Sequence, residues 1–211
     1  MGVFRYGVQS MNTPDPKEDR LTLEVLSAVD SGSRLSQRRL ANQMGVALGL
    51  ANSYVKRCVR KGFIKISEAP ANRYIYYLTP KGFSEKSRLT ARFLSSSLDF
   101  YRHAANSCSD LYRQLADAGD SRVILCGNSE LAEIALLQAM DVRVEVLGLF
   151  DPICKKTEFF SRPVWHELNQ VPEVPRVLTS LDRALELKEH LVAESPGLQI
   201  LIPEVLGIST D

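Results

Sequence analysis

A stretch of 35 residues without glycine or proline, from Ser84 to Ala118, constrains the fold of this chain more than any other feature. The stretch keeps a helical pattern throughout, so the sequence predicts one uninterrupted helix about 50 Å long. One small domain cannot cover a helix of that length. We therefore expect a domain over residues 15–83, a long linking helix over 84–118 and a second domain over 119–211, with a flexible arm over residues 1–14.

Apolar residues recur along the long helix at alternating spacings of four and three, which is the heptad seam of a coiled coil. The seam consists of Leu94, Leu98, Tyr101, Ala105, Cys108, Tyr112 and Leu115. We expect it to pair two copies of the chain in a homodimer. The alternative is that this helix face packs on the protein's own core.

The formal net charge of +1 hides an uneven distribution. Residues 1–100 carry 16 basic and 8 acidic side chains, a net charge of +8, whereas residues 101–211 carry 10 and 17, a net charge of −7. The segment from Ser31 to Arg92 has 13 basic and two acidic residues, a net charge of +11. Such a segment favours double-stranded DNA as a partner; the alternative is an ordinary solvated surface.

The basic segment also has the pattern of a helix-turn-helix. Pro16 opens a first helix behind the capping residue Asp15, and Ser36 caps a second helix that ends at Gly45. A third helix is predicted from about Ala47 to Lys61, and two short strands after it form a hairpin, or wing. The domain is therefore predicted to be a winged helix.

Helical spacing sorts the side chains of the third helix into two faces. The inward set is Leu48, Ala51, Val55, Cys58 and Val59. The outward set, expected at base edges in the major groove, is Asn52, Ser53, Lys56 and Arg57. Phosphate contacts are expected from Arg38, Arg39, Lys56, Arg60 and Lys61. At the wing tip, Asn72 and Arg73 are expected to enter the minor groove or to contact its phosphates.

Residues from about 20 to 105 resemble the MarR-type winged-helix regulators associated with exopolysaccharide genes. The likeness rests on Gly45-Val46, Leu48-Gly49, Asn52, Lys56 and Lys61-Gly62, and above all on the segments Tyr77–Gly82, Glu85-Lys86 and Arg88–Leu94. Early in the recognition helix the family has Ser and Lys where this chain has Ala47 and Leu50. The resemblance implies a dimeric regulator of transcription, of surface-polysaccharide genes in that family, with a target sequence of its own.

The acidic half alternates apolar strands with helices. Strands are predicted at 123–126, 142–150, 176–178 and 198–202, and helices at 130–140 and 182–192. This order implies a parallel sheet covered by helices. The fold class is therefore α/β in two domains: a winged helix and a small Rossmann-like domain, joined by the long helix.

The turn after the first of these strands has part of a dinucleotide-binding fingerprint. Gly127, Ser129 and Ala132 fall at the glycine positions, with Asn128 between the first two, and Asp151 stands 24 residues after Gly127 at the end of the next strand. Ser129 obstructs the close approach of a pyrophosphate. We expect a nucleotide or nucleotide sugar as effector at this turn; the alternative is an ordinary strand-to-helix turn.

Two further families resemble this half over short stretches. Val123 to Pro152 is similar to the Rossmann domain of the NADH-sensing Rex repressors. The same region resembles the N-terminal domain of polysaccharide-biosynthesis epimerase/dehydratase proteins, at Gly127, at Gly148 to Asp151 and at Pro163-Val164. Both resemblances imply a ligand-sensing or nucleotide-sugar-related module.

Little in the sequence points to catalysis or to a metal. His103, His166 and His190 are scattered, and no nucleophile or carboxylate lies near them at an informative spacing. Four cysteines form no CxxC pair and are expected as reduced thiols of a cytoplasmic protein. No apolar run approaches the roughly 20 residues of a membrane span, so no membrane partner is expected.

The sequence thus predicts a regulator and leaves two other classes open. One is a nucleotide-sugar-related enzyme with an appended DNA-binding domain. The other is a regulator whose C-terminal domain is a ligand-free assembly module.

Overall fold

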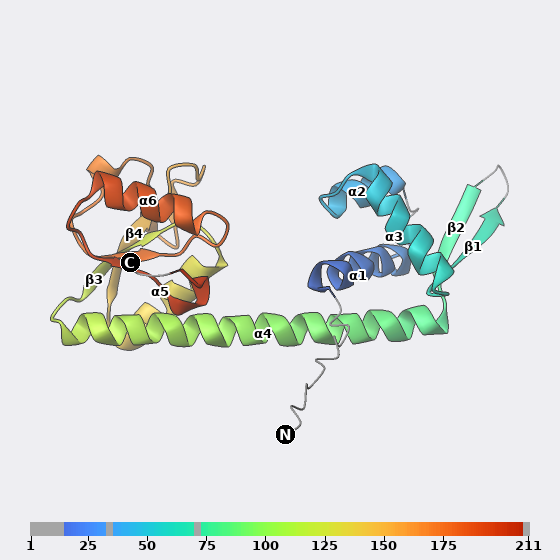
Figure 1. Ribbon diagram of the computed structural model, residues 1–211, viewed down its shortest axis with the longest axis horizontal. Helices are drawn as coiled ribbons and strands as arrows, with labels where there is room; N and C mark the ends of the chain where they lie inside the picture. Colours follow the sequence, from blue (N-terminus) through green and yellow to red (C-terminus); the bar gives the residue numbers. More distant parts are fainter. Residues whose placement is uncertain (1–14, 33–35, 70–72, 209–211) are drawn as a thin grey trace, which may run out of the picture. The chain divides into compact units, whose positions relative to one another are not determined.

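The computed structural model describes residues 15–32, 36–69 and 73–208 (Figure 1). The chain forms two compact units that divide between Ser96 and Ser97, within one helix, α4 (Pro80–Asp117). Each unit is described by itself. The predicted arm over residues 1–14 lies outside the described residues.

The N-terminal unit contains three helices and a hairpin before α4. These are α1 (Pro16–Asp30), α2 (Gln37–Gln43), α3 (Leu48–Arg60), β1 (Ile64–Ala69) and β2 (Arg73–Leu78). The predicted caps are confirmed, since Asp15 accepts a hydrogen bond from the Lys17 N–H and Ser36 accepts one from the Arg39 N–H. The strands pair antiparallel from Ile64 opposite Leu78 to Ala69 opposite Arg73. This is the predicted winged helix.

One apolar core joins these elements. It contains Leu21, Val25 and Leu26 of α1, Leu40 of α2, Ala51, Val55 and Cys58 of α3, and Leu89 of α4. The prediction that Leu48 faces inward is wrong, because it lies in the first turn of α3 and is 44% exposed. The first turns of α4 belong to this core because Leu89 is 2% exposed within it.

The junction between the wing and α4 is fixed by two hydrogen bonds of Thr79 and by close packing at Gly82. The Thr79 hydroxyl donates to the Gly62 carbonyl at 2.6 Å and accepts from the Gly82 N–H at 3.0 Å. Gly82 has no room for a side chain, since a Cβ there would lie 2.0 Å from the Phe63 carbonyl oxygen. Because Thr79 caps the helix and Pro80 fits its first position, α4 starts at Pro80 and not at the predicted Ser84.

The C-terminal unit is a three-layer α/β structure. Its sheet has the strand order β5-β6-β4-β3-β7-β8, and all neighbouring strands are parallel except β5 and β6. The strands are β3 (Arg122–Cys126), β4 (Glu145–Phe150), β5 (Glu158–Phe159), β6 (Arg162–Trp165), β7 (Arg176–Leu178) and β8 (Ile200–Leu201). The helices are α5 (Glu130–Val142), α6 (Ala184–Glu194) and the short η1 (Leu168–Gln170) and η2 (Glu204–Leu206).

The two faces of this sheet bury different residues. Val123 and Leu125 of β3 pack with α5 and with the last turns of α4, whereas Ile124 and Cys126 pack with α6. The predicted parallel sheet is confirmed. Strands β5 and β6 were not predicted, because they lie in the proline-bearing loop and Pro163 in β6 breaks the usual strand signal.

The structure divides the predicted heptad seam into two parts. Cys108, Tyr112 and Leu115 are buried in the core of the C-terminal unit, and Ala105 is half-buried against it. For these residues the dimer prediction is wrong, because α5 and the sheet already cover this face of α4. Leu94, Leu98 and Tyr101 are 55%, 52% and 42% exposed.

All four cysteines are free, and Cys58, Cys108 and Cys126 are buried. No helix in the described ranges combines the length and the apolar character that crossing a bilayer requires.

Candidate nucleic-acid interface and ligand site

The exposed face of α3 presents Ser53, Lys56 and Arg60. These residues lie opposite the buried Ala51 and Val55, as their helical spacing requires. The Ser53 hydroxyl donates to the Gly49 carbonyl one turn earlier at 2.9 Å. A major-groove helix needs such a face, free of the protein's own core.

Asn52 is not on this face. Its side chain is half-buried, and its amide oxygen is buried with no hydrogen-bond partner among the described residues. The prediction that Asn52 reads a base therefore has no support in the geometry. Each helical residue advances by about 100°, so Asn52 lies on the flank of the helix, next to the buried side.

Carboxylates pair with four cations of the basic segment, of which only Arg57 was predicted to contact DNA. Arg57 pairs with Glu18 of α1, Arg92 pairs with Asp19 of α1, and Lys86 pairs with Asp30 at the end of α1. Arg88 pairs with Glu85 at 2.8 Å, and this hydrogen bond lowers the pKa of the Glu85 carboxyl. The net charge of +11 over Ser31 to Arg92 leaves out α1, so it overstates the free charge of the folded unit.

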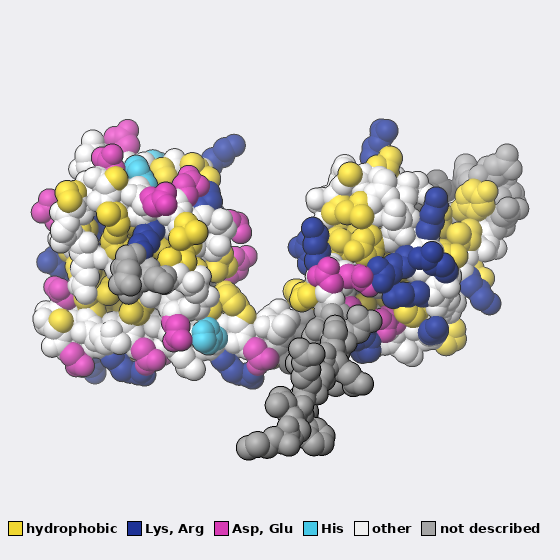
Figure 2. All heavy atoms as spheres, in the orientation of Figure 1, with side chains coloured by type: hydrophobic (Ala, Val, Ile, Leu, Met, Phe, Trp, Pro, Cys, Tyr) yellow, Lys and Arg dark blue, Asp and Glu magenta, His cyan; other side chains and the backbone are white. Residues whose placement is uncertain are grey.

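Six exposed cations on or next to α2, α3 and β1 form no ion pair in the part of the chain that the structure describes. They are Arg38, Arg39, Lys56, Arg60, Lys61 and Lys65. We call them the cationic face. Figure 2 shows Lys and Arg side chains gathered over the N-terminal unit. Lys65 was not predicted, although its place in a strand that alternates inward and outward residues gave the signal.

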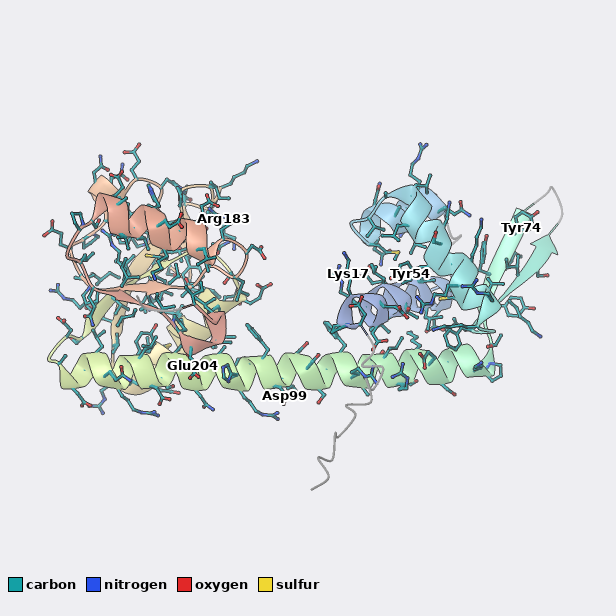
Figure 3. All side chains as sticks on the ribbon, viewed as in Figure 1. Lys17, Tyr54, Tyr74, Asp99, Arg183 and Glu204 are labelled. Carbon is teal, nitrogen blue, oxygen red and sulfur yellow. The ribbon has the colours of Figure 1, made fainter. Side chains whose placement is uncertain are left out.

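The predicted DNA contacts of Asn72 and Arg73 at the wing tip stay predictions. Asn72 lies outside the described residues, and Arg73 opens β2 without a described side chain. Next to them, Tyr74 and Ile75 are exposed (Figure 3 labels Tyr74). The hairpin therefore presents apolar as well as basic side chains to solvent.

The predicted ligand residues of the C-terminal unit meet at one edge of the sheet. After β3 the chain adds β4 and then β6 on one side, and it returns to place β7 on the other side. This reversal leaves a crevice beyond the carboxyl ends of the strands, where ligands bind in doubly wound sheets. Asn128, Ser129 and Asp151 line a cavity of about 240 Å³ there, with Cys154 and Arg183.

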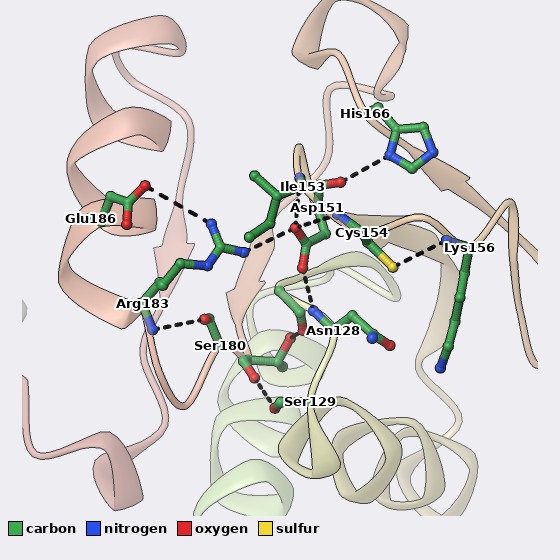
Figure 4. Close-up of polar contacts among 12 residues, drawn as sticks. Asn128, Ser129, Asp151, Ile153, Cys154, Lys156, His166, Ser180, Arg183 and Glu186 are labelled. Atoms are coloured by element: carbon green, nitrogen blue, oxygen red, sulfur yellow. Dashed lines mark hydrogen bonds and ion pairs between the residues drawn. The ribbon is translucent and has the colours of Figure 1, made fainter. Parts of the chain in front are cut away.

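Asp151 already has four donors in this crevice (Figure 4). Its carboxylate accepts from the N–H groups of Asn128, Ile153 and Cys154 at 2.9, 3.1 and 3.2 Å, and from the Arg183 guanidinium at 3.0 Å. Burial by itself raises the pKa of Asp151, but the backbone hydrogen bonds and the Arg183 charge outweigh burial and lower it. Asp151 thus lies at the acidic position of the fingerprint, which contacts the ribose in dinucleotide-binding folds. Here its carboxylate is hydrogen-bonded by the protein's own groups.

The turn before α5 is equally well connected. Ser129 caps α5 by accepting from the Leu131 N–H at 3.1 Å, and its hydroxyl donates to the Thr179 carbonyl. Gly127 has φ +104°, and a Cβ there would lie 2.5 Å from the Ser180 Cβ. This glycine is needed for the close approach of β7's end. Ala132 is buried beneath the turn, where its side chain meets no ligand.

Residues 18–65 match a sequence family described as winged helix-turn-helix DNA-binding. This match agrees with the winged-helix fold of the N-terminal unit. The match spans most of α1, all of α2 and α3, and the first residues of β1. Comparison with curated proteins gave no match.

Solved structures give weaker likenesses. The PcaV transcriptional regulator from Streptomyces coelicolor, solved with its natural ligand, is 25% identical over 53% of this chain and 79% of its own, with a TM-score of 0.36. The zinc-dependent MarR family regulator AdcR is 15% identical over 50% and 70%, with a TM-score of 0.34. The O-methyltransferase NcsB1 from neocarzinostatin biosynthesis is 11% identical over 95% and 82%, with a TM-score of 0.35. At these TM-scores the likenesses carry no argument about function.

In residues 15–32, 36–69 and 73–208, no three His, Cys, Asp or Glu side chains are grouped so as to hold a metal ion. The Nδ1 of His166 lies 3.0 Å from the Asp151 carbonyl oxygen, which ties this histidine to the backbone.

The Asp151 contacts predict a pH-dependent contribution to stability. Replacing Asp151 with Asn removes the charge that Arg183 pairs with and reverses one hydrogen-bonding group, so we expect a loss of about 2–4 kcal/mol at pH 7. Because the folded pKa lies below the unfolded one, this contribution is present above about pH 4 and is lost as the pH falls through the folded pKa.

Urea unfolding of both proteins between pH 7 and pH 3 measures this difference. The difference in the free energy of unfolding between wild type and D151N should become smaller as the pH falls. A gap that stays constant with pH would contradict a stabilising role for the Asp151 charge.

Proposed function

We propose that the protein is a MarR-type transcription regulator that binds double-stranded DNA as a homodimer. The observation that carries this proposal is the cationic face. Six exposed, unpaired cations surround the outward side of α3 in a winged helix-turn-helix domain. We assign base-edge contacts to Ser53 and Lys56, and phosphate contacts to Arg38, Arg39, Arg60, Lys61 and Lys65. The likeness to MarR regulators of exopolysaccharide genes makes polysaccharide genes the proposed targets.

The proposed dimer interface is the exposed middle of α4. Every residue from Ala91 to His103 is exposed, and the stretch includes Phe93, Leu94, Leu98 and Tyr101. An isolated helix does not keep several large apolar side chains in water without a partner. Two antiparallel or parallel copies of this stretch would cover them, with Leu94, Leu98 and Tyr101 as the contact residues.

The C-terminal unit is proposed to bind an effector, a nucleotide or nucleotide sugar, at the crevice beyond β3 and β7. The strand reversal at β3 supports this placement. An effector that prefers one arrangement of the dimer would shift the population of DNA-competent molecules. A second candidate is that this unit is a ligand-free assembly module. The four protein donors that already bind the Asp151 carboxylate favour it. Absorbance near 260 nm and mass spectrometry of the purified protein decide between the two.

Removing two cations of the cationic face tests DNA binding. We expect K56A/R60A to bind DNA more weakly and to lose part of its sequence preference, because Lys56 is assigned to a base edge. The slope of log affinity against log salt should fall by at least about one, since Arg60 is assigned to a phosphate and each lost phosphate contact lowers the slope by about one. Fluorescence anisotropy with labelled duplex at several salt concentrations measures both. The matched control is K155A/K156A, which removes two exposed lysines from the C-terminal unit. Equal slopes for the two double variants would remove α3 from the interface.

Charges in the exposed middle of α4 test the dimer. We expect L94E/L98E to sediment as a monomer at concentrations where the wild type is a dimer, because two carboxylates would be desolvated in the interface. The matched control is L137E/L185E, which places the same charges on exposed leucines of α5 and α6. The proposed interface is refuted by a wild type that sediments as a monomer, or by L94E/L98E remaining a dimer.

A further inference from the structure

A second cavity in the C-terminal unit contains a buried cation. Arg176 opens β7 and is 2% exposed. Its backbone is central in the sheet, paired with Ile124 of β3 and Ile200 of β8. Its guanidinium donates to the Ser195 hydroxyl at 2.8 Å, at the C-terminal end of α6. This site lies at the amino ends of the strands, whereas the crevice with Asp151 lies beyond their carboxyl ends.

No carboxylate lies within ion-pair distance of Arg176 in the part of the chain that the structure describes, although the Glu173 charge acts on it from farther away. The Nε of Arg176 is buried without a hydrogen-bond acceptor. A buried ion without a partner costs several kcal/mol. The end of α6 supplies about half a negative charge, yet burial still lowers the pKa of Arg176 below its ordinary value. Arg183 in the same unit shows the usual solution, because it pairs with Asp151.

Arg176 lines a cavity of about 580 Å³, which is within the usual size range of ligand pockets, about 300–1,000 Å³. Leu168, Val171 and Leu198 form apolar parts of its wall. Glu173 and Glu194 also line it and are exposed. The cavity therefore combines one buried cation, apolar walls and an acidic rim.

We propose that this cavity binds a small organic monocarboxylate, whose carboxylate pairs with Arg176 and whose apolar body lies against Leu168, Val171 and Leu198. A guanidinium has the planar geometry that matches a carboxylate through two hydrogen bonds. The rim glutamates repel a dianion such as phosphate more than they repel a singly charged acid. The apolar walls favour an acid with a hydrocarbon body. The site is independent of the proposed DNA binding and of the proposed nucleotide crevice.

Titration of the full-length protein tests the proposal, with sodium benzoate, sodium hexanoate and inorganic phosphate as probes at constant ionic strength. We expect benzoate or hexanoate to bind saturably at one site per chain in calorimetry and to raise the unfolding temperature. Phosphate should do neither. R176Q should weaken carboxylate binding at least about tenfold, the loss of a charge-assisted pair. R122Q is the matched control, because Arg122 opens the neighbouring strand β3 but is exposed.

A pair of variants in the cavity wall keeps the test decisive if R176Q does not fold. L198E would place a carboxylate in the cavity, and L198Q is its neutral match. We expect L198E to unfold at a higher temperature than L198Q and to bind neither carboxylate. The proposal is overturned if no carboxylate binds the wild type, if phosphate binds more tightly than both carboxylates, or if L198E and L198Q behave alike. Arg176 would then serve only to cap α6.

Discussion

Each of the two compact units has a hydrophobic core that includes residues of α4. Leu89 near its start is buried with α1 and α3, and Ala104, Cys108, Tyr112 and Leu115 near its end are buried with α5 and the sheet. Packing on both cores, more than helix propensity, stabilises the two ends. The middle, from Ala91 to His103, is covered by neither core, so its apolar side chains are exposed. The proposed dimer follows from this division of the helix.

Charge in the N-terminal unit is divided in a similar way. Glu18, Asp19 and Asp30 pair with cations of α3 and α4, and these ion pairs hold α1 against its neighbours. Such half-exposed pairs contribute modestly to stability. Their larger effect is on function, because they remove Arg57 and Arg92 from the set of free cations. The cationic face lies on or next to α2, α3 and β1, on the side of α3 that the core leaves open.

Local patterns in the sequence predicted most of the fold. The caps at Asp15 and Ser36, the wing and the strand Arg176–Leu178 were all found, because each depends on neighbours in the chain. Contacts between distant residues were not predictable. The burial of Cys108 and Tyr112 depends on α5 and the sheet, and the loss of Arg57 to Glu18 depends on how α1 folds back.

The candidate sites show the same limit. Asn52 was misplaced by a small error in helical phase, and the fingerprint around Gly127 led to the right edge of the sheet without revealing that Asp151 is already bound by the protein's own groups. Arg176 was read only as the first residue of a strand, and nothing in a single sequence shows that its charge is buried without a carboxylate. Such properties arise from tertiary packing between residues that lie far apart in the sequence.

In the proposed dimer, two copies of the chain present α3 to one DNA duplex. Selection of bound duplexes from a random pool, followed by sequencing, tests this claim most directly. A symmetric dimer predicts an inverted repeat whose half-sites are about 10 base pairs apart or a multiple of that spacing. Enrichment of a single unrepeated half-site, or of no sequence at all, would contradict it.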